Sequence, residues 1–144
     1  MSQRSLLLGV LALSLSALAG SADDGFRVIA HPSVPGDSID RKTLGAIYLK
    51  QVVHWSTGVA IEPIDQSASS PVRARFSEAV FGQPVAWVTS HWSRLMTSGK
   101  GWPPAVKASD ADVIAQVRKN RGAIGYVSAA ATLDETVKVL ELLD

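Results

Sequence analysis

The stretch PIDQSASSPVRARF, residues 63–76, combines the end of an expected β-strand, a loop of small hydroxyl residues and the start of an expected helix. Proline is favoured at the first position of a helix, so we expect a helix to begin near Ser70-Pro71. A helix start offers free backbone N–H groups and the positive end of the helix dipole. Several serine hydroxyls and two arginines lie in the same stretch. The sequence therefore predicts a site for a small oxyanion such as phosphate.

Six polar side chains in and beside this loop are the candidate ligand-binding residues. They are Asp65, Ser67, Ser69, Ser70, Arg73 and Arg75. Serine commonly caps a helix, so Ser69 or Ser70 has a second interpretation that is compatible with the first. Asp65 would either accept a proton from a protonated oxyanion or bond to nearby backbone N–H groups. Arg73 and Arg75 are two residues apart on a helix, so at most one of them should face the anion.

The first 22 residues have the pattern of a secretory signal peptide. Arg4 gives a positive start, residues 6–18 form an uncharged apolar run, and small-residue cleavage signals follow at residues 17–22. We therefore expect cleavage after Ala22, export to the periplasm, and one mature domain over residues 23–144. No later segment is long and apolar enough to span a bilayer. The absence of cysteine fits a bacterial periplasm.

The expected mature domain is neutral, which bears on its partners. Without Arg4 the chain has 13 basic and 13 acidic residues. A neutral domain with no basic stripe is not typical of nucleic-acid binding. His31, His54 and His91 are widely spaced and show no metal-ligand pattern. We therefore expect no nucleic-acid partner, no metal and no cofactor.

Helix and strand signals alternate along the chain on both sides of the loop. Strands are expected at 26–30 and 123–127, β-like runs at 52–55 and 59–64 around a turn at 56–58, and a strand or short helix at 137–142. Helices are expected from a cap at Asp37, Ser38 or Asp40 to about 49, from 71 to Gly82, from Pro84 to 97, and from Ser109 to about 121. This alternation predicts an α/β fold with helices against a mixed sheet.

Three of the four tryptophans bear on possible binding surfaces. Trp87 and Trp92 follow the helical periodicity of their apolar neighbours, which favours core packing over a ligand platform. Trp102 precedes two prolines, and we expect it to anchor a rigid loop.

Four segments, in this order and spacing, resemble one protein family. They are LGAIYLK (44–50) followed by WSTG (55–58); PIDQ (63–66) with the serine-rich loop and RARF (73–76); HWSR (91–94) followed by GKGWPP (99–104); and GAIGYV (122–127). The chain resembles the periplasmic phosphate-binding proteins of ABC transporters, and most closely their short, single-lobe relatives. The resemblance implies one lobe of the type II periplasmic-binding-protein fold, with a mixed sheet flanked by helices.

The resemblance also bears on the loop. Members of the family hold phosphate between two lobes with backbone N–H groups, hydroxyls, an Arg and an Asp, and carry a loop of the type Arg-x-Asp-Gly-Ser-Gly-Thr at a helix start. This chain matches that loop at Asp65, Ser67 and, with Ser for Thr, Ser69. It departs from the loop at Pro63, in place of Arg, and at the two Gly positions, which are Gln66 and Ala68. Arg73 or Arg75 would have to replace the missing charge.

These observations lead to a main hypothesis and an alternative. The main hypothesis is a secreted, non-enzymatic solute-binding module for phosphate or a related oxyanion, linked by the resemblance to phosphate ABC transport. Its expected partners are the anion and either the membrane components of a transporter or a second copy of the chain. The alternative is a protein-interaction or sensor-associated lobe that has lost tight ligand binding.

A third, less favoured hypothesis is an esterase. The segment Gly36-Asp37-Ser38-Ile39 resembles the nucleophile block of Gly-Asp-Ser-type esterases. A serine nucleophile needs a histidine within hydrogen-bond reach to take its proton. Those enzymes carry that histidine near the C-terminus, whereas no histidine follows His91 here. A helix-capping role for the Asp-Ser pair is therefore favoured, and no catalytic residue is assigned.

Overall fold

The computed structural model describes residues 24–144 of the chain. The expected leader, residues 1–22, lies outside this range. The described residues form six strands and four helices. The strands are β1 (Phe26–Ala30), β2 (Ser38–Asp40), β3 (Glu62–Gln66), β4 (Ala105–Lys107), β5 (Ala123–Ser128) and β6 (Lys138–Leu143). The helices are α1 (Arg41–Tyr48), α2 (Pro71–Phe81), α3 (Val85–Thr97) and α4 (Asp110–Lys119). None of these helices has the length and apolar character that crossing a bilayer requires.

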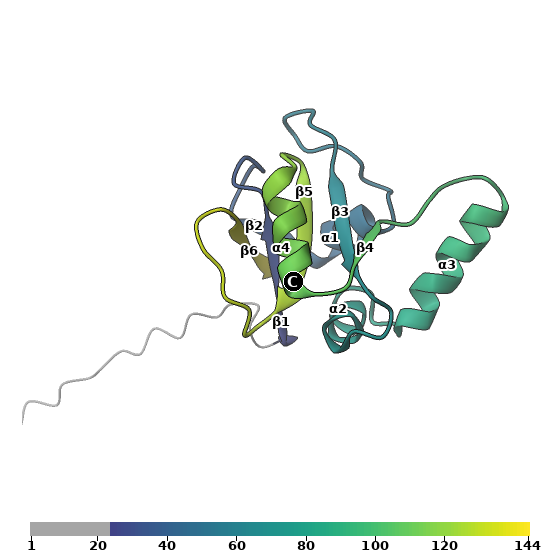
Figure 1. Cartoon of the computed structure of the whole chain (residues 1–144). Coiled ribbons are helices and arrows are strands. Elements are labelled where there is room, and N and C mark those ends of the chain that lie inside the picture. Colours follow the sequence, from purple (N-terminus) through teal and green to yellow (C-terminus); the bar gives the residue numbers. More distant parts are fainter. Residues whose placement is uncertain (1–23) are drawn as a thin grey trace, which may run out of the picture.

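The six strands form one sheet in the order β2-β6-β1-β5-β3-β4 (Figure 1). β1 is antiparallel to both of its neighbours, β5 and β6. The other pairs, β2 with β6, β3 with β5 and β3 with β4, are parallel. This is the mixed α/β sheet that the alternation predicted. Because β3 and β5 are parallel, their carboxyl ends meet at one edge of the sheet.

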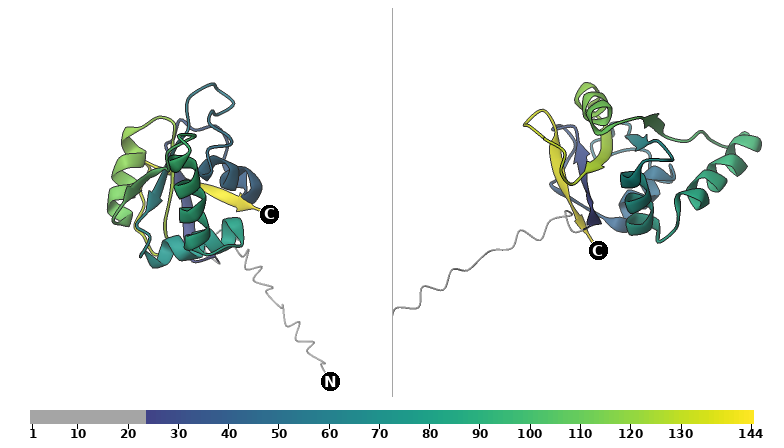
Figure 2. Two further views of the ribbon diagram at one scale, coloured as in Figure 1. Left: turned by 90° about the vertical axis from the view of Figure 1, so that its right-hand side faces the viewer. Right: turned by 60° about the horizontal axis from the view of Figure 1, so that its bottom comes forward.

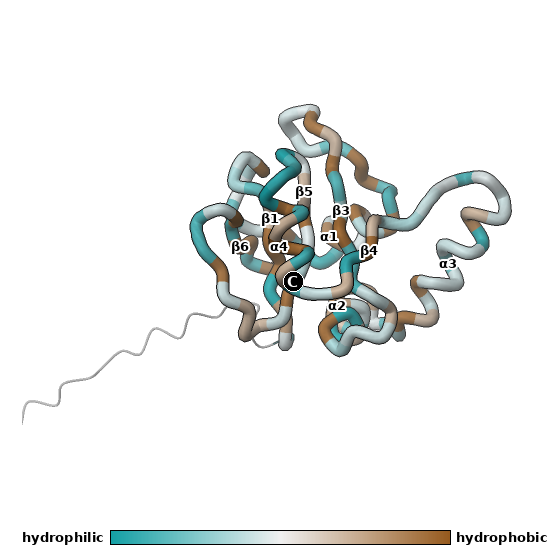
Figure 3. The backbone as a smooth tube through the Cα atoms, in the orientation of Figure 1, coloured by the Kyte–Doolittle hydropathy of each residue, from teal (hydrophilic) through white to brown (hydrophobic). Residues whose placement is uncertain are grey.

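The sheet is covered on both faces, and the residues of β1 show why. Alternate residues of a strand point to opposite faces. Val28 and Ala30 pack with α1 and α2 on one face, while Ile29 packs with Val113 and Val117 of α4 on the other. Figure 1 shows α4 in front of the sheet and α1 behind it. Figure 3 shows hydrophobic residues within the central strands and a mixture of hydrophobic and hydrophilic residues along α4.

Aromatic rings fill the core on the α1 and α2 side. Phe76 stacks on Tyr126 with ring centroids 3.9 Å apart and meets Phe26 edge-on at 5.4 Å. Tyr48 packs edge-on against Phe76 at 4.8 Å, and its hydroxyl donates to the carbonyl of Ile64 at 2.8 Å. The core therefore holds α2 firmly against the end of β3, which is where the serine-rich loop lies.

The predicted helix boundaries are confirmed where a local capping signal exists. Asp40 caps α1 by accepting from the backbone N–H of Thr43, and Ser109 caps α4 by accepting from that of Asp112. Gly82 ends α2 in the left-handed conformation at φ 62°. Residues 138–143 form a strand rather than the short helix that the sequence also allowed at 137–142.

Two regions differ from the sequence-based expectations. Of the β-like runs at 52–55 and 59–64, residues 62–64 belong to β3, whereas the pairing around the turn at 56–58 is limited to an isolated bridge between His54 and Ala60. The segment before Glu62 instead crosses closely over Gly122, and the Trp55 indole donates to the Gly122 carbonyl at 3.0 Å. The three-residue strands β2 and β4 carry no sequence signal long enough to have predicted them.

Helix α3 and the return segment 98–104 form an arm that stands away from the sheet (Figures 1 and 2). We call these residues, 85–104, the α3 arm. Trp92 is 4% exposed, as the core interpretation predicted, whereas Trp87 is 38% and Trp102 is 72% exposed. The predictions for Trp87 and Trp102 were therefore wrong. The reason is that α3 packs mainly on α2, where Trp87 contacts Phe81, so the arm has no second layer to bury these rings.

Candidate functional site

The loop between β3 and α2 has a defined backbone conformation. The N–H of Ser67 donates to Lys107 of β4 at 3.1 Å, and the N–H of Ser70 donates back to the carbonyl of Ser67 at 2.9 Å. Ser70 is the N-cap residue of α2 and Pro71 is the first helical residue, as the sequence predicted. The Ser70 side chain makes no capping bond to the helix. Its hydroxyl donates instead to Oε1 of Gln66 at 3.2 Å.

Arg73 points inward, beneath the loop. Its side chain is buried, Nη1 donates to the carbonyl of Gln66 at 2.9 Å, and Nη2 lies 3.4 Å from Oδ2 of Asp65. The guanidinium therefore supports the end of β3 from inside the protein. Its hydrogen bonds go to protein groups rather than to the surface of the loop.

Asp65 lies in the same buried layer as Arg73. It accepts from the backbone N–H of Gln66 at 2.9 Å and from the hydroxyl of Tyr126. Burial raises the pKa of the Asp65 carboxyl, while the nearby Arg73 charge and these hydrogen bonds act in the opposite direction. Burial and the Asp65 charge likewise raise the pKa of the Tyr126 hydroxyl. Asp65 therefore stabilises the loop through local bonds, which was one of its two sequence-based interpretations.

Three serine hydroxyls lie on the outer side of the loop or at its end. Ser67 and Ser69 are close together, with their Oγ atoms 3.2 Å apart, and Ser69 is exposed. Ser70 lies at the start of α2 and borders a shallow depression with a volume of about 240 Å³. These hydroxyls are the groups of the loop that an approaching solute would meet first.

Arg75, unlike Arg73, is exposed and lies at the rim of that depression. Its aliphatic stem lies against Gly25, where an added Cβ would come within 2.6 Å of Cδ. The structure thus separates the two arginines that the sequence had left undecided. Arg73 is inside the protein, and Arg75 is the cationic side chain among the residues that line the depression.

The lining of the depression also includes a negative charge. Asp110, the first residue of α4, accepts from the backbone N–H of Ser128 at 3.1 Å, from the Ser128 hydroxyl, and from Nε2 of Gln66 at 2.9 Å. Burial raises the pKa of the Asp110 carboxyl, but these three hydrogen bonds outweigh it and the pKa is lowered. Asp110 is therefore a fixed anion in the lining that it shares with Ser70 and Arg75.

Sequence reasoning missed Gln66, Asp110 and Ser128 as site residues. Gln66 stands at a Gly position of the family loop, and its side chain joins the loop to Asp110 and to the carbonyl of Tyr126 at 3.0 Å. The strand order contains a signal that could have located Gln66 and Ser128. β3 ends at Gln66 and β5 ends at Ser128, and the carboxyl ends of parallel neighbours meet at one edge of the sheet.

The six predicted residues therefore fall into two layers. Ser67, Ser69, Ser70 and Arg75 lie at the surface around the start of α2, while Asp65 and Arg73 lie beneath it. Their assignment as ligand-binding residues stays a prediction. The outer layer can supply hydroxyl donors and one cation, and the inner layer fixes the backbone that presents them.

The other sequence-based candidates give no catalytic or metal centre within residues 24–144. No group of three or more His, Asp or Glu side chains in that range is arranged to hold a metal ion. Ser38, Asp40 and His54 line a common pocket, yet no hydrogen bond joins them among these residues. The Asp40 carboxylate bonds to Thr43 instead.

Comparison with known proteins identifies the fold. Neither a protein-family model nor a curated protein sequence matches the chain. Solved structures do match. An ABC-type phosphate transport receptor from Vibrio cholerae has a TM-score of 0.64 at 20% identity, over 82% of this chain and 46% of that chain. A putative phosphate ABC transporter substrate-binding protein with bound phosphate from Clostridium perfringens gives 0.65 at 20%, over 82% and 44%.

A third match shows the same relationship. PstS from Borrelia burgdorferi has a TM-score of 0.62 at 16% identity, over 82% of this chain and 47% of that chain. This chain therefore spans less than half the length of the proteins that it matches. The matches confirm the expected fold, that of phosphate-binding proteins of ABC transporters, over a portion consistent with a single lobe.

Proposed function

We propose that this chain is a non-enzymatic solute-binding module that holds phosphate or a related oxyanion at the surface of the loop 67–70 and the start of α2. The observation that supports it is the position of exposed hydroxyl donors and Arg75 beside a helix N-terminus, on a fold shared with phosphate receptors. Hydroxyls and a guanidinium are the donors that suit an oxyanion, and the helix dipole favours negative charge at this end.

The charges around the loop lead us to expect weak binding. Arg73 is bonded to Asp65 and Gln66, so Arg75 is the cation that remains beside Ser70 in the lining of the depression. Asp110, which also lines the depression, repels a dianion. The site is also shallow, so the solution screens its charges. We therefore expect affinity that falls as the salt concentration rises.

Titration of the protein with phosphate, arsenate, phosphonate and sulfate tests this proposal. Amide NMR spectra recorded at low and at physiological salt should show saturable shifts in residues 67–75, larger at low salt. Shifts spread over the whole surface, or none with any of the four anions, would show that the loop is not an oxyanion site. A neutral solute such as glycerol serves as the control titration.

The proposal includes export to the periplasm and delivery of the anion to a transporter. Its support is the leader-like pattern of residues 1–22 and the fold shared with transport receptors. Expression in a Gram-negative host with sequencing of the mature N-terminus tests the first part, with Asp23 expected as the first residue. Recovery of the uncut chain in the cytoplasm would contradict it.

A second candidate function, a protein-interaction lobe, is favoured by the α3 arm. Residues 85–104 contain no acidic residue but contain Arg94 and Lys100, and Lys107 follows in β4. Exposed apolar side chains accompany this positive charge: Trp102, Trp87 and Met96, the last 37% exposed. Aromatic side chains, methionine and arginine are enriched at protein interfaces, and the positive charge is complementary to an acidic surface. The expected partner is therefore an acidic protein surface, either on a transporter component or on a second copy.

Charge reversal in the arm distinguishes the two functions. A double variant, Arg94→Glu with Lys100→Glu, should abolish salt-sensitive association with a partner or a second copy, measured by cross-linking at low and high salt. The same variant should leave the anion-induced NMR shifts of residues 67–75 unchanged, because both substituted residues lie on the arm. Unchanged association in the variant would remove the arm as an interface.

A further inference from the structure

A second pocket shares no lining residue with the depression beside the serine-rich loop. It has a volume of about 430 Å³ and is bordered by β2, α1 and the loop 51–61. Ile39, Ile47 and Leu140, all buried, form part of its lining, and Trp55 forms part of its wall. Pockets that bind small molecules typically have volumes of 300–1,000 Å³ and mostly apolar walls with a few polar groups. This pocket has both properties.

The charge of this pocket comes from one residue. Asp40 is the one Asp, Glu, Lys or Arg side chain among the residues that line it. Oδ1 accepts from the N–H of Thr43 at 2.8 Å, and Oδ2 accepts from the Thr43 hydroxyl at 2.8 Å. An ionised carboxylate offers about four acceptor positions, so about two remain for a ligand.

The nearest cation in sequence is committed elsewhere. Arg41 bonds to Asp24 at 2.8 Å, to Asp144 at 2.9 Å and to the carbonyl of Ala79 at 3.0 Å. Within residues 24–144, no salt bridge joins Asp40 to a basic side chain. The hydrogen bonds from Thr43 lower the pKa of the Asp40 carboxyl, and the charge of Lys42 lowers it to a smaller degree. Asp40 is therefore ionised at neutral pH.

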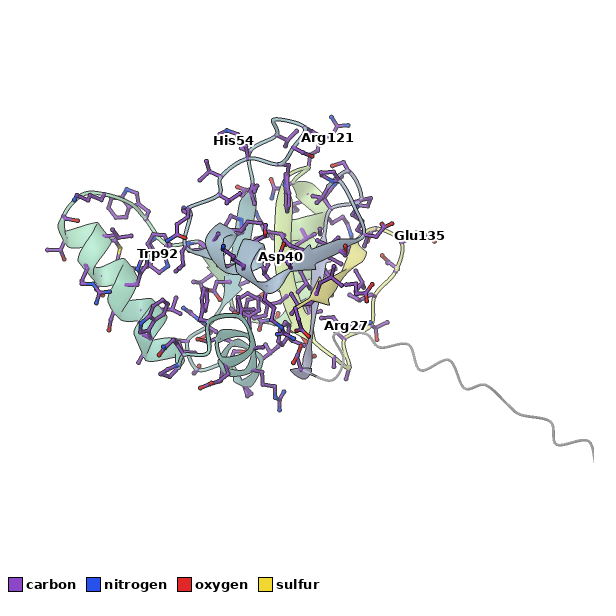
Figure 4. All side chains as sticks on the ribbon, turned by 180° about the vertical axis from the view of Figure 1, so that it is seen from behind. Arg27, Asp40, His54, Trp92, Arg121 and Glu135 are labelled. Atoms are coloured by element: carbon purple, nitrogen blue, oxygen red, sulfur yellow. The ribbon has the colours of Figure 1, made fainter. Side chains whose placement is uncertain are left out.

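The remaining polar groups lie around the same pocket. Ser38 and Ser56 contribute hydroxyls, and His54 lies on the loop 51–61. In the view of Figure 4, Asp40 lies at the start of α1 and His54 on the loop above it. A ligand that enters here would therefore meet apolar walls, a carboxylate and neutral donors. None of the pocket residues belongs to the serine-rich loop.

We propose that this pocket binds a small organic cation, namely an amine that carries an aromatic or branched aliphatic group. The ammonium group would pair with the free acceptor positions of Asp40, and the apolar group would lie against Ile47, Leu140 and Trp55. The positive end of α1 opposes a cation, but Asp40 already takes the Thr43 N–H and supplies a full negative charge at this helix end. The negative charge of this pocket thus suits a cation, whereas the serine-rich loop is proposed to hold an anion.

Three probes of one shape and different charge test the proposal. They are phenethylamine, 2-phenylethanol and phenylacetate, titrated into the protein at pH 7 and followed by amide and indole NMR. The amine should give saturable shifts at the Trp55 indole and in residues 38–47. A charged hydrogen bond supports an affinity roughly tenfold higher for the amine than for phenylacetate. Equal affinities, shifts elsewhere, or no saturable shift with any probe would overturn the proposal.

Matched variants separate the charge from the pocket. Asp40→Asn keeps a good capping residue and should abolish most of the preference for the amine over 2-phenylethanol. Asp37→Asn removes an exposed acid that does not line the pocket, and it should change nothing. Val52→Trp places a bulky side chain at a partly exposed lining position and should weaken binding of all three probes. An amine preference that survives Asp40→Asn would contradict the assignment of Asp40.

Discussion

Arg73 and Asp65 form a buried ion pair, with Nη2 3.4 Å from Oδ2, directly beneath the loop that carries the candidate binding serines. The same guanidinium donates to the carbonyl of Gln66, the last residue of β3. The positive charge of Arg73 is thus compensated within the protein. The Arg73 side chain therefore orders the loop from beneath, and the exposed cation at the outer side of the loop is Arg75.

Removal of the Arg73 charge should strongly destabilise the fold. Arg73→Met leaves the Asp65 carboxylate buried without its cation, and breaking such a pair typically costs about 3–5 kcal/mol. The double variant Arg73→Met with Asp65→Leu should lose less free energy of unfolding than Arg73→Met alone, because no unpaired carboxylate remains. Urea unfolding of the variants measures both effects. Arg75→Met is the control and should change the free energy of unfolding by less than about 0.5 kcal/mol. A small loss in Arg73→Met would mean that the pair contributes little.

The outer arginine should matter for the anion and not for the fold. If the loop 67–70 binds phosphate, Arg75→Gln should weaken the affinity by roughly three- to tenfold at low salt, because it removes one charge-assisted contact. Arg118→Gln, which changes an exposed arginine on α4, should leave the affinity unchanged. Amide NMR titrations of the three proteins provide the comparison. Equal weakening by both substitutions would indicate an effect of net charge alone.

Two aspartates should affect acid stability in opposite directions. The pKa of Asp110 is lowered in the folded state, so its contribution is present above its ordinary value of 3.8 and is lost as the pH falls through the folded value. Asp110→Asn should therefore reduce the loss of stability between pH 7 and pH 3. The pKa of Asp65 is raised in the folded protein, so protonation of Asp65 at low pH stabilises the fold. Asp65→Asn removes this contribution and should enlarge the loss of stability between pH 7 and pH 3. Urea unfolding at the two pH values tests both signs.

The close contact at Gly122 should not tolerate a methyl group. A Cβ added there would lie 1.9 Å from the carbonyl oxygen of Ala60, which is backbone and cannot rotate away. Gly122→Ala should cost about 1–3 kcal/mol or more and loosen the bond from the Trp55 indole. At Gly101 the nearest atom is 3.5 Å away on a side chain, so Gly101→Ala is the control and should be nearly neutral. Thermal unfolding and Trp55 NMR report the two effects.

Two serines at helix starts should differ in their contribution to stability. Ser109 accepts from the N–H of Asp112, so Ser109→Ala should cost about 1 kcal/mol. Ser70 makes no such bond to α2, so Ser70→Ala should cost less. Chemical denaturation of both variants settles the order. The reverse order would show that the Ser70 hydroxyl stabilises α2 by another route, such as its bond to Gln66.

The sequence was most informative where structure depends on near neighbours. The start of α4 and the end of α2 follow from capping residues within one helical turn. β2 could not be found in this way, because it pairs with β6, which lies about 100 residues further along the chain. Helical spacing showed only that Arg73 and Arg75 point in different directions. Which of the two lies inside the protein could not be predicted, because it depends on the tertiary contact of Arg73 with the buried Asp65.

The side chain of Arg41 has a consequence for the connectivity of the chain. It bonds both Asp24 and Asp144, so the first and last residues that the structure describes lie within reach of one guanidinium. A linker of about five residues, at roughly 3.3–3.6 Å per residue, would therefore join them. The polypeptide could then be reopened at the exposed turn 56–58, giving a circular permutant that retains the same sheet order.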